Sequence, residues 1–105
     1  MKLEIYRFEL GGKYTEYTIF LNGVLLGANT LDTPAQIEDT DKSTISNILY
    51  YLVDDMDEVI SRIINQPAGV KHIPCGNCIY SSSNDIVLKE LDIKLKMKEI
   101  EGDFK

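Results

Sequence analysis

The sequence predicts an α+β fold in which an antiparallel sheet of four to five strands packs on one long amphipathic helix. Three observations predict it. Two turn signals divide an N-terminal stretch rich in β-branched and aromatic residues, apolar residues then recur at steps of three and four, and a final stretch alternates apolar with charged residues. The chain has 105 residues, of which 44% are hydrophobic, so residues 1–105 are expected to form a single α+β domain.

The first strands follow from two tight turns, a Gly-Gly pair at 11–12 and an Asn-Gly pair at 22–23. Both pairs tolerate the positive φ angles that tight hairpins require. The runs around them are rich in Tyr, Thr, Ile and Phe, which favour strands. We therefore expect a three-stranded antiparallel meander. Its strands would cover residues 2–10, 13–21 and 24–28.

One long helix is predicted by the apolar residues that follow. They recur at steps of three and four over residues 45–64, which places them on one face of a helix. Asp41 or Ser43 is expected to cap its start, after a polar loop over residues 29–42. A proline just beyond the pattern ends it, so the expected span lies near residues 43–65.

The C-terminal part is expected to add one more strand. Residues 67–85 are rich in Gly, Pro and Ser and predict a loop with a short strand near Ile79 and Tyr80. Residues 91–97 alternate apolar and charged side chains, a pattern typical of a strand with one buried face. This C-terminal strand would join the N-terminal meander in one sheet.

The formal net charge of −6 is concentrated in residues 30–58. That segment opposes eight acidic side chains with Lys42 alone, whereas acids and bases nearly balance before and after it. A surface of this charge repels nucleic acid and attracts a basic protein. The residues predicted to bind such a partner are Glu38, Asp39, Asp41, Asp54, Asp55, Asp57 and Glu58.

A second explanation of these acids stays open: they can form an ordinary hydrated helix face that binds no partner. Against it, four acids fall within the five residues 54–58, where like charges repel, and a helix that needed only solubility would interleave signs. The acids at 38–41 also suit the positive end of a helix. Tyr50 and Tyr51 stand at the border of the apolar stripe, so one is expected at the core edge and the other at the surface.

Little else points to chemistry. His72, Cys75 and Cys78 have a spacing that could hold zinc, but a closed structural site needs four ligands, so a second subunit or another residue would have to complete it. Two reduced thiols in a loop are the favoured interpretation, with a redox pair as a further alternative. We expect no cofactor. With one histidine, no nucleophile beside a base and no phosphate loop, the chain is expected not to be an enzyme.

No apolar run approaches the roughly 18 residues that a membrane helix needs, and no signal-peptide pattern opens the chain. A cytoplasmic protein without membrane contact is therefore expected. Its residue usage, rich in isoleucine and poor in alanine, is typical of AT-rich bacterial genomes and their mobile elements.

In size, acidity, residue usage and lack of motifs, the whole chain resembles small phage- or plasmid-encoded anti-defence proteins, anti-CRISPR proteins above all. The resemblance is one of profile, without a shared motif. It implies an inhibitor whose residues 38–58 occupy the nucleic-acid-binding site of a basic nuclease or other nucleic-acid-handling protein. Two alternatives are an immunity protein that neutralises a cognate toxin, and a zinc-stabilised regulatory or scaffold protein, with a dimer as a possible state.

Overall fold

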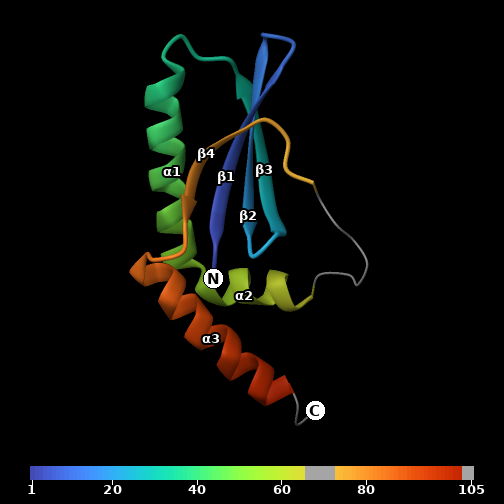
Figure 1. The fold of residues 1–105 in the computed structure, drawn as a ribbon, viewed down its shortest axis with the longest axis vertical. Helices are drawn as coiled ribbons and strands as arrows, with labels where there is room; N and C mark the ends of the chain where they lie inside the picture. Colours follow the sequence, from blue (N-terminus) through green and yellow to red (C-terminus); the bar gives the residue numbers. More distant parts are fainter. Residues whose placement is uncertain (66–72, 103–105) are drawn as a thin grey trace.

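One antiparallel sheet and three helices form the part of the chain that the computed structural model describes, residues 1–65 and 73–102. The sheet has the order β3-β2-β1-β4. Helix α1 runs alongside the strands, α2 lies across one end of the sheet, and α3 leads away from it (Figure 1). The elements are β1 (Leu3–Leu10), β2 (Tyr14–Leu21), β3 (Val24–Asp32), α1 (Ile37–Asp54), α2 (Met56–Ile64), β4 (Asn77–Ser82) and α3 (Ile86–Gly102).

The N-terminal meander is confirmed. Strand β1 pairs with β2, and β2 pairs with β3, each antiparallel and in chain order. Both predicted turns contain residues with positive φ: Gly11 and Gly12 in the first, Asn22 and Gly23 in the second. Strand β3 continues to Asp32, beyond the predicted end, because it stays paired with β2 along its length.

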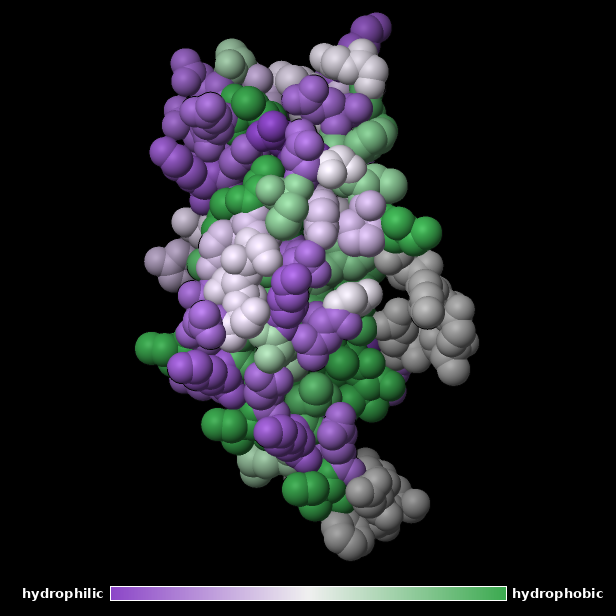
Figure 2. Space-filling model, in the orientation of Figure 1, coloured by the Kyte–Doolittle hydropathy of each residue, from purple (hydrophilic) through white to green (hydrophobic). Residues whose placement is uncertain are grey.

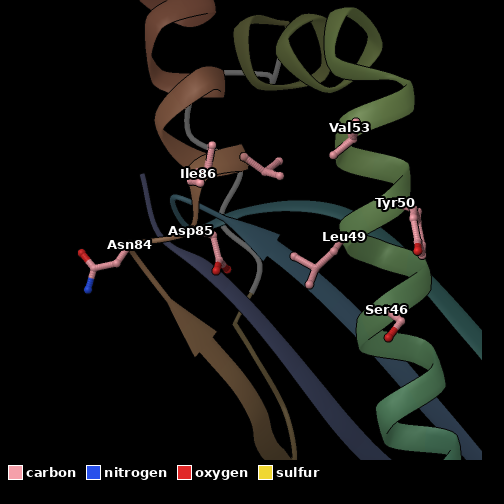
Figure 3. Close-up of a pocket in the computed structure, with 8 residues that line it drawn as sticks. Ser46, Leu49, Tyr50, Val53, Asn84, Asp85 and Ile86 are labelled. Atoms are coloured by element: carbon pink, nitrogen blue, oxygen red, sulfur yellow. The ribbon is translucent and has the colours of Figure 1, made fainter.

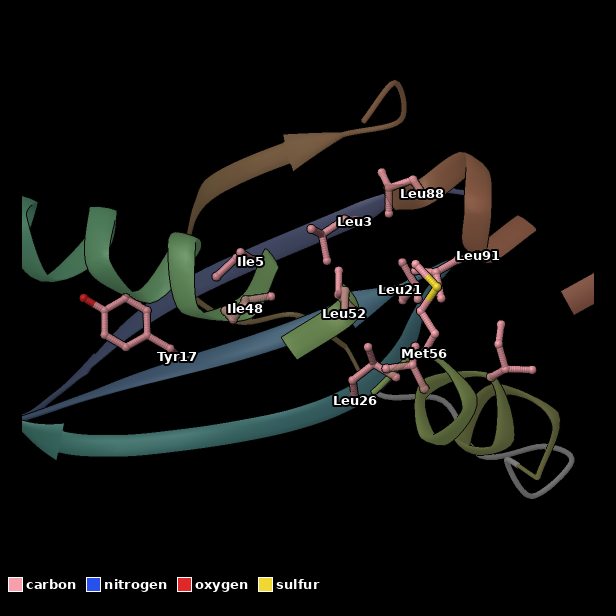
Figure 4. Close-up of a cluster of buried hydrophobic side chains, with 12 residues drawn as sticks. Leu3, Ile5, Tyr17, Leu21, Leu26, Ile48, Leu52, Met56, Leu88 and Leu91 are labelled. Carbon is pink, nitrogen blue, oxygen red and sulfur yellow. The ribbon is translucent and has the colours of Figure 1, made fainter. Parts of the chain in front are cut away.

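The core lies between the sheet and the helices. Successive residues of a strand point to opposite faces, and in β1 the inward positions include Leu3 and Ile5, both fully buried. Their neighbours across the strand pair include Leu21, and Leu52 covers them from α1 (Figure 4). The full buried apolar cluster is Leu3, Ile5, Tyr17, Leu21, Leu26, Ile48, Leu52, Met56, Val59, Ile60, Leu88 and Leu91.

The single long helix predicted near residues 43–65 is wrong in two respects. The helix starts at Ile37, well before the predicted residue, with Glu38 and Asp39 in its first turn, where negative charge suits the helix N-terminus. It also breaks at Asp55, which closes α1 and opens α2 with non-helical backbone angles. The apolar pattern runs through the break without a gap, so periodicity alone could not reveal it.

The break at Asp55 lets the second helix close the end of the sheet. Met56, Val59 and Ile60 of α2 are buried in the core beside Leu26 of β3. Arg62, at the other end of α2, donates a hydrogen bond from Nη1 to the carbonyl oxygen of Leu26. A straight helix would have carried these side chains past the strand ends into solvent.

The predicted C-terminal strand over residues 91–97 is wrong, because these residues belong to helix α3. The fourth strand is β4 instead, which includes the short strand expected near Ile79 and Tyr80 and pairs with β1. The alternating pattern was interpreted as a strand, but a helix can also produce it. Side chains two residues apart in a helix point in nearly opposite directions, whereas those four apart share a face. Leu91 and Leu95 face the core, while Ile93 and Met97 lie on the exposed side.

Candidate protein-docking surface

The structure divides the seven predicted acidic residues among three places. Asp41 is turned into the molecule, Glu38 and Asp39 are exposed at the start of α1, and the other four are exposed where α1 meets α2. Sixteen residues of helix rise separate the last two groups, which is about 24 Å. We call the four carboxylates at the helix junction, Asp54, Asp55, Asp57 and Glu58, the junction acids.

Asp41 anchors α1 to the middle of the sheet. One carboxylate oxygen accepts a hydrogen bond from Nη1 of Arg7, and the other accepts one from the Tyr17 hydroxyl at 2.5 Å. Arg7 and Tyr17 are themselves cross-strand partners in β1 and β2. The side chains of Arg7 and Asp41 are only 17% and 14% exposed, so the pair is largely withdrawn from water. Burial, and then the hydrogen bond to Asp41, raise the pKa of Tyr17 above its usual range.

The junction acids, by contrast, line an open hollow of about 320 Å³ together with Val53, Met56 and Lys94. The side chain of Asp57 is 84% exposed and meets Nζ of Lys94 at 3.5 Å. Glu58 meets Arg62 one turn later along α2 at 3.3 Å. Exposed pairs of this kind are worth little in water. The hollow therefore keeps a negative character that two surface cations only partly offset.

A larger, apolar pocket of about 560 Å³ adjoins the junction acids and shares Val53 with their hollow. It lies between α1 and the start of α3, and Leu49 points from α1 toward the segment that leads into α3 (Figure 3). Tyr50, which is 70% exposed, lies at its edge. Its lining residues are Ser46, Leu49, Tyr50, Val53, Asn84, Asp85, Ile86 and Val87.

The apolar pocket and the junction acids together form one continuous surface, which we call the docking surface. Sequence reasoning identified its acidic part and expected one of the two tyrosines at the surface; Tyr50 is that residue, and Tyr51 is half-buried. It did not find the pocket, because nothing in the sequence pattern places Ile86 and Val87 beside α1. The hydrophobic colouring in Figure 2 mixes apolar and polar side chains over the lower part of the molecule, where α2 and α3 lie.

The candidate zinc ligands are only partly described. Cys75 and Cys78 are both exposed, free thiols, and His72 lies outside the described residues. Within residues 1–65 and 73–102, no group of three or more His, Cys, Asp or Glu side chains could hold a metal ion. Gly76 between the cysteines has positive φ, and a Cβ there would collide with the carbonyl oxygen of Arg7. This turn packs closely on β1 and has room only for glycine.

Comparison of the chain with models of protein families, with curated protein sequences and with solved structures gave no match. None of the helices in the described part of the chain is long and apolar enough to cross a membrane.

Proposed function

We propose that this chain is a non-enzymatic inhibitor that binds a basic protein through the docking surface. The observation that carries the proposal is the adjacency of an open apolar pocket and the junction acids, which meet at Val53. Protein interfaces commonly combine an apolar centre, rich in aromatic residues, with a polar rim. Tyr50 and the apolar pocket would supply the centre, and the junction acids would supply one side of the rim.

The charge of the surface indicates the kind of partner. Exposed carboxylates attract a surface rich in Lys and Arg and speed its association, and they repel nucleic acid. Surfaces of that basic kind line the channels in which nucleases hold DNA or RNA. A chain that places Asp54, Asp55 and Asp57 in such a channel would compete with the phosphates for the same cations. This is the mode of action that the resemblance to anti-CRISPR proteins also implies.

The apolar pocket makes the proposal more specific than charge competition. Ion pairs formed in water contribute little affinity, whereas an apolar side chain of the partner that enters the pocket beside Leu49 would leave water. We therefore expect the partner to present an apolar side chain next to its basic residues. Affinity would come mainly from the pocket, and the rate and salt dependence of association from the junction acids.

The test compares two variants of equal charge. The junction variant carries Asp54→Lys, Asp55→Lys, Asp57→Lys and Glu58→Lys. The control variant carries Glu9→Lys, Asp32→Lys, Glu38→Lys and Asp39→Lys, at four exposed carboxylates away from the junction. Each reverses four charges, so the two proteins have the same net charge. Binding of labelled target DNA by purified bacterial RNA-guided nucleases is measured by fluorescence anisotropy at increasing concentrations of each protein.

The unchanged protein is expected to displace DNA from at least one nuclease. The junction variant should need a concentration at least about 100-fold higher, because four Lys side chains would then face the basic surface of the partner and repel it, while the control variant stays within about threefold. An equal loss in both variants would show that only total charge matters. Displacement by neither the unchanged protein nor the variants, across the nuclease panel, would exclude the proposed inhibition.

A further inference from the structure

Helix α3 carries two apolar stripes on opposite sides. The inner stripe, Leu88, Leu91 and Leu95, packs on the core of its own molecule. With about 100° of rotation per residue, four further apolar residues of the helix gather on the opposite side. They form the outer stripe: Ile86, Ile93, Met97 and Ile100. A helix on the surface of a monomer normally has one apolar stripe and a polar opposite face.

The outer stripe is open to solvent along the helix. Its four side chains are 57–73% exposed, and beyond Leu91 no residue of α3 up to Ile100 is buried. The last turns of α3 project away from the sheet (Figure 1). The Cα radius of gyration is 14.9 Å, against about 13 Å for a compact chain of this length, and the long axis reaches 51 Å. Short helices without packing are marginal in water, and among the described apolar residues in the second half of α3 only Leu95 packs against the core.

The charges beside the outer stripe are complementary to those of the docking surface. Lys89 and Lys96 follow one border of the outer stripe and make it basic. The other border carries Glu90 and Lys94, and Lys94 already meets Asp57 of its own chain. The docking surface is also apolar, but it carries the junction acids, of which Asp54 and Asp55 directly follow Val53. One chain therefore carries an apolar, basic helix face and an apolar, acidic pocket that fit each other in chemistry.

We infer that the outer stripe binds the docking surface of a second copy of this chain. Ile86 belongs to the outer stripe and also lines the apolar pocket, so the two surfaces adjoin at the start of α3. Two copies related by a two-fold axis can then exchange contacts reciprocally, with the end of each α3 against the pocket of the other and the α3 helices antiparallel. Such an isologous contact closes on itself as a dimer. Met97 and Ile100 would enter the partner's pocket, and Lys96 would lie beside Asp54.

This dimer would cover the surface proposed to bind a basic partner. Self-association and partner binding would then be mutually exclusive, and dilution or the partner itself would release the active monomer. That consequence rests on the proposed function, but the self-association does not. Measurement of the oligomeric state alone therefore tests the inference without any partner.

The primary experiment is sedimentation velocity over a wide concentration series, in reductant and chelator. The unchanged protein should shift from one chain to twice that mass. Met97→Glu places a charge in the buried centre and should raise the dissociation constant at least about tenfold. Ile73→Glu is the matched control: Ile73 is 83% exposed and belongs to neither surface, so this variant should associate like the unchanged protein.

A charge exchange tests the specific pairing. Lys96→Glu and Asp54→Lys should each weaken self-association, because each places two like charges at the contact. An equimolar mixture of the two variants should recover it, since the carboxylate introduced at position 96 of one chain then meets the ammonium group introduced at position 54 of the other. Circular dichroism confirms that each variant keeps its helices.

Three outcomes would overturn the inference. One is a single-chain mass for the unchanged protein at every concentration, including the case in which that monomer binds vesicles of anionic lipid through α3. Another is a dimer that Met97→Glu leaves intact. The third is a dimer that appears only when zinc is added or reductant is omitted, which would assign the contact to Cys75 and Cys78.

Discussion

Asp41 and the junction acids are the same chemical group in one stretch of the chain, yet the structure puts them to opposite uses. Asp41 is held by Arg7 and Tyr17 between α1 and the sheet. The junction acids stand in water around an open hollow. A buried carboxylate is costly unless it is paired, and once paired, its removal leaves a buried cation behind. An exposed carboxylate costs little and remains available for another molecule.

The comparison teaches that charge counted along the chain does not identify a binding surface. Asp41 belongs to the same acidic segment as Asp54, but it lies on the face of α1 that is turned toward the sheet. Its contribution is therefore to the stability of the fold, and the junction acids are the ones whose loss the fold should tolerate. Three sets of variants sharpen or break this contrast.

The largest effect is expected for Asp41→Ala. It leaves the guanidinium of Arg7 without its carboxylate and the hydroxyl of Tyr17 without its acceptor, both largely shielded from water. We expect the free energy of unfolding to fall by about 3 kcal/mol, measured by urea denaturation at neutral pH. Asp39→Ala, two residues earlier and exposed, should change it by less than about 0.5 kcal/mol. Equal losses in the two variants would contradict the internal role of Asp41.

A smaller effect is expected for Tyr17→Phe, with a distinctive pH dependence. Because the pKa of Tyr17 is raised in the folded protein, its neutral phenol is favoured there. The resulting stability is fully present below the unfolded pKa of about 10 and is lost as the pH rises above it. Tyr17→Phe should lower the free energy of unfolding by about 1–2 kcal/mol at neutral pH. It should also make the fall of stability above pH 10 less steep than in the unchanged protein.

Other tyrosines set the background of that measurement. A hydrogen bond to Glu4 raises the pKa of Tyr6 to about 12, burial raises the pKa of Tyr51, and a hydrogen bond to Asp85 raises the pKa of Tyr80. Some alkaline loss should therefore persist in Tyr17→Phe. Tyr50→Phe, at an exposed side chain, is the control and should leave neutral stability within about 0.5 kcal/mol. An alkaline profile unchanged by Tyr17→Phe would refute the linkage.

The smallest effects are expected at the junction acids, and they should differ in sign. Asp54 is the last residue of α1, where the helix dipole disfavours negative charge, so Asp54→Asn should raise the free energy of unfolding by about 0.5 kcal/mol. Asp57 is in the first turn of α2 and meets Lys94, so Asp57→Asn should lower it by a similar amount. Thermal and urea unfolding at low salt measure both. An equal rise in the free energy of unfolding of the two variants would mean that repulsion among the acids outweighs the effect of the helix dipoles.

The parts of the fold that were predictable are those with local causes. The meander follows from Gly-Gly and Asn-Gly turns whose positive φ the structure contains, and from the strand-forming residues beside them. The helical character of residues 45–64 follows from their periodicity. The break at Asp55 was not predictable in this way, because a change of direction leaves the spacing of apolar residues unaltered.

The docking surface was only half predictable, for a related reason. The acidity at 54–58 is visible in the sequence, as is the exposed position of one neighbouring tyrosine. The pocket requires Ile86 and Val87 to lie beside Val53, and that contact joins segments more than thirty residues apart. Arg7 lies two residues after Ile5 in the same strand and therefore on the same inward face. This inward position of a cation was the one local sign that a buried carboxylate would be needed.

The sequence by itself determined the local backbone of the N-terminal part: where the chain turns, that the stretches beside those turns are strands, and which apolar residues follow a helical repeat. Tertiary structure alone decided that residues 91–97 are helical, that Asp41 is internal, and that the junction acids adjoin an apolar pocket. The physical reason is that an alternating pattern can be met by a strand with one buried face or by a helix with two apolar sides. Only the packing of the rest of the chain, with β4 already at the edge of β1, selects between them.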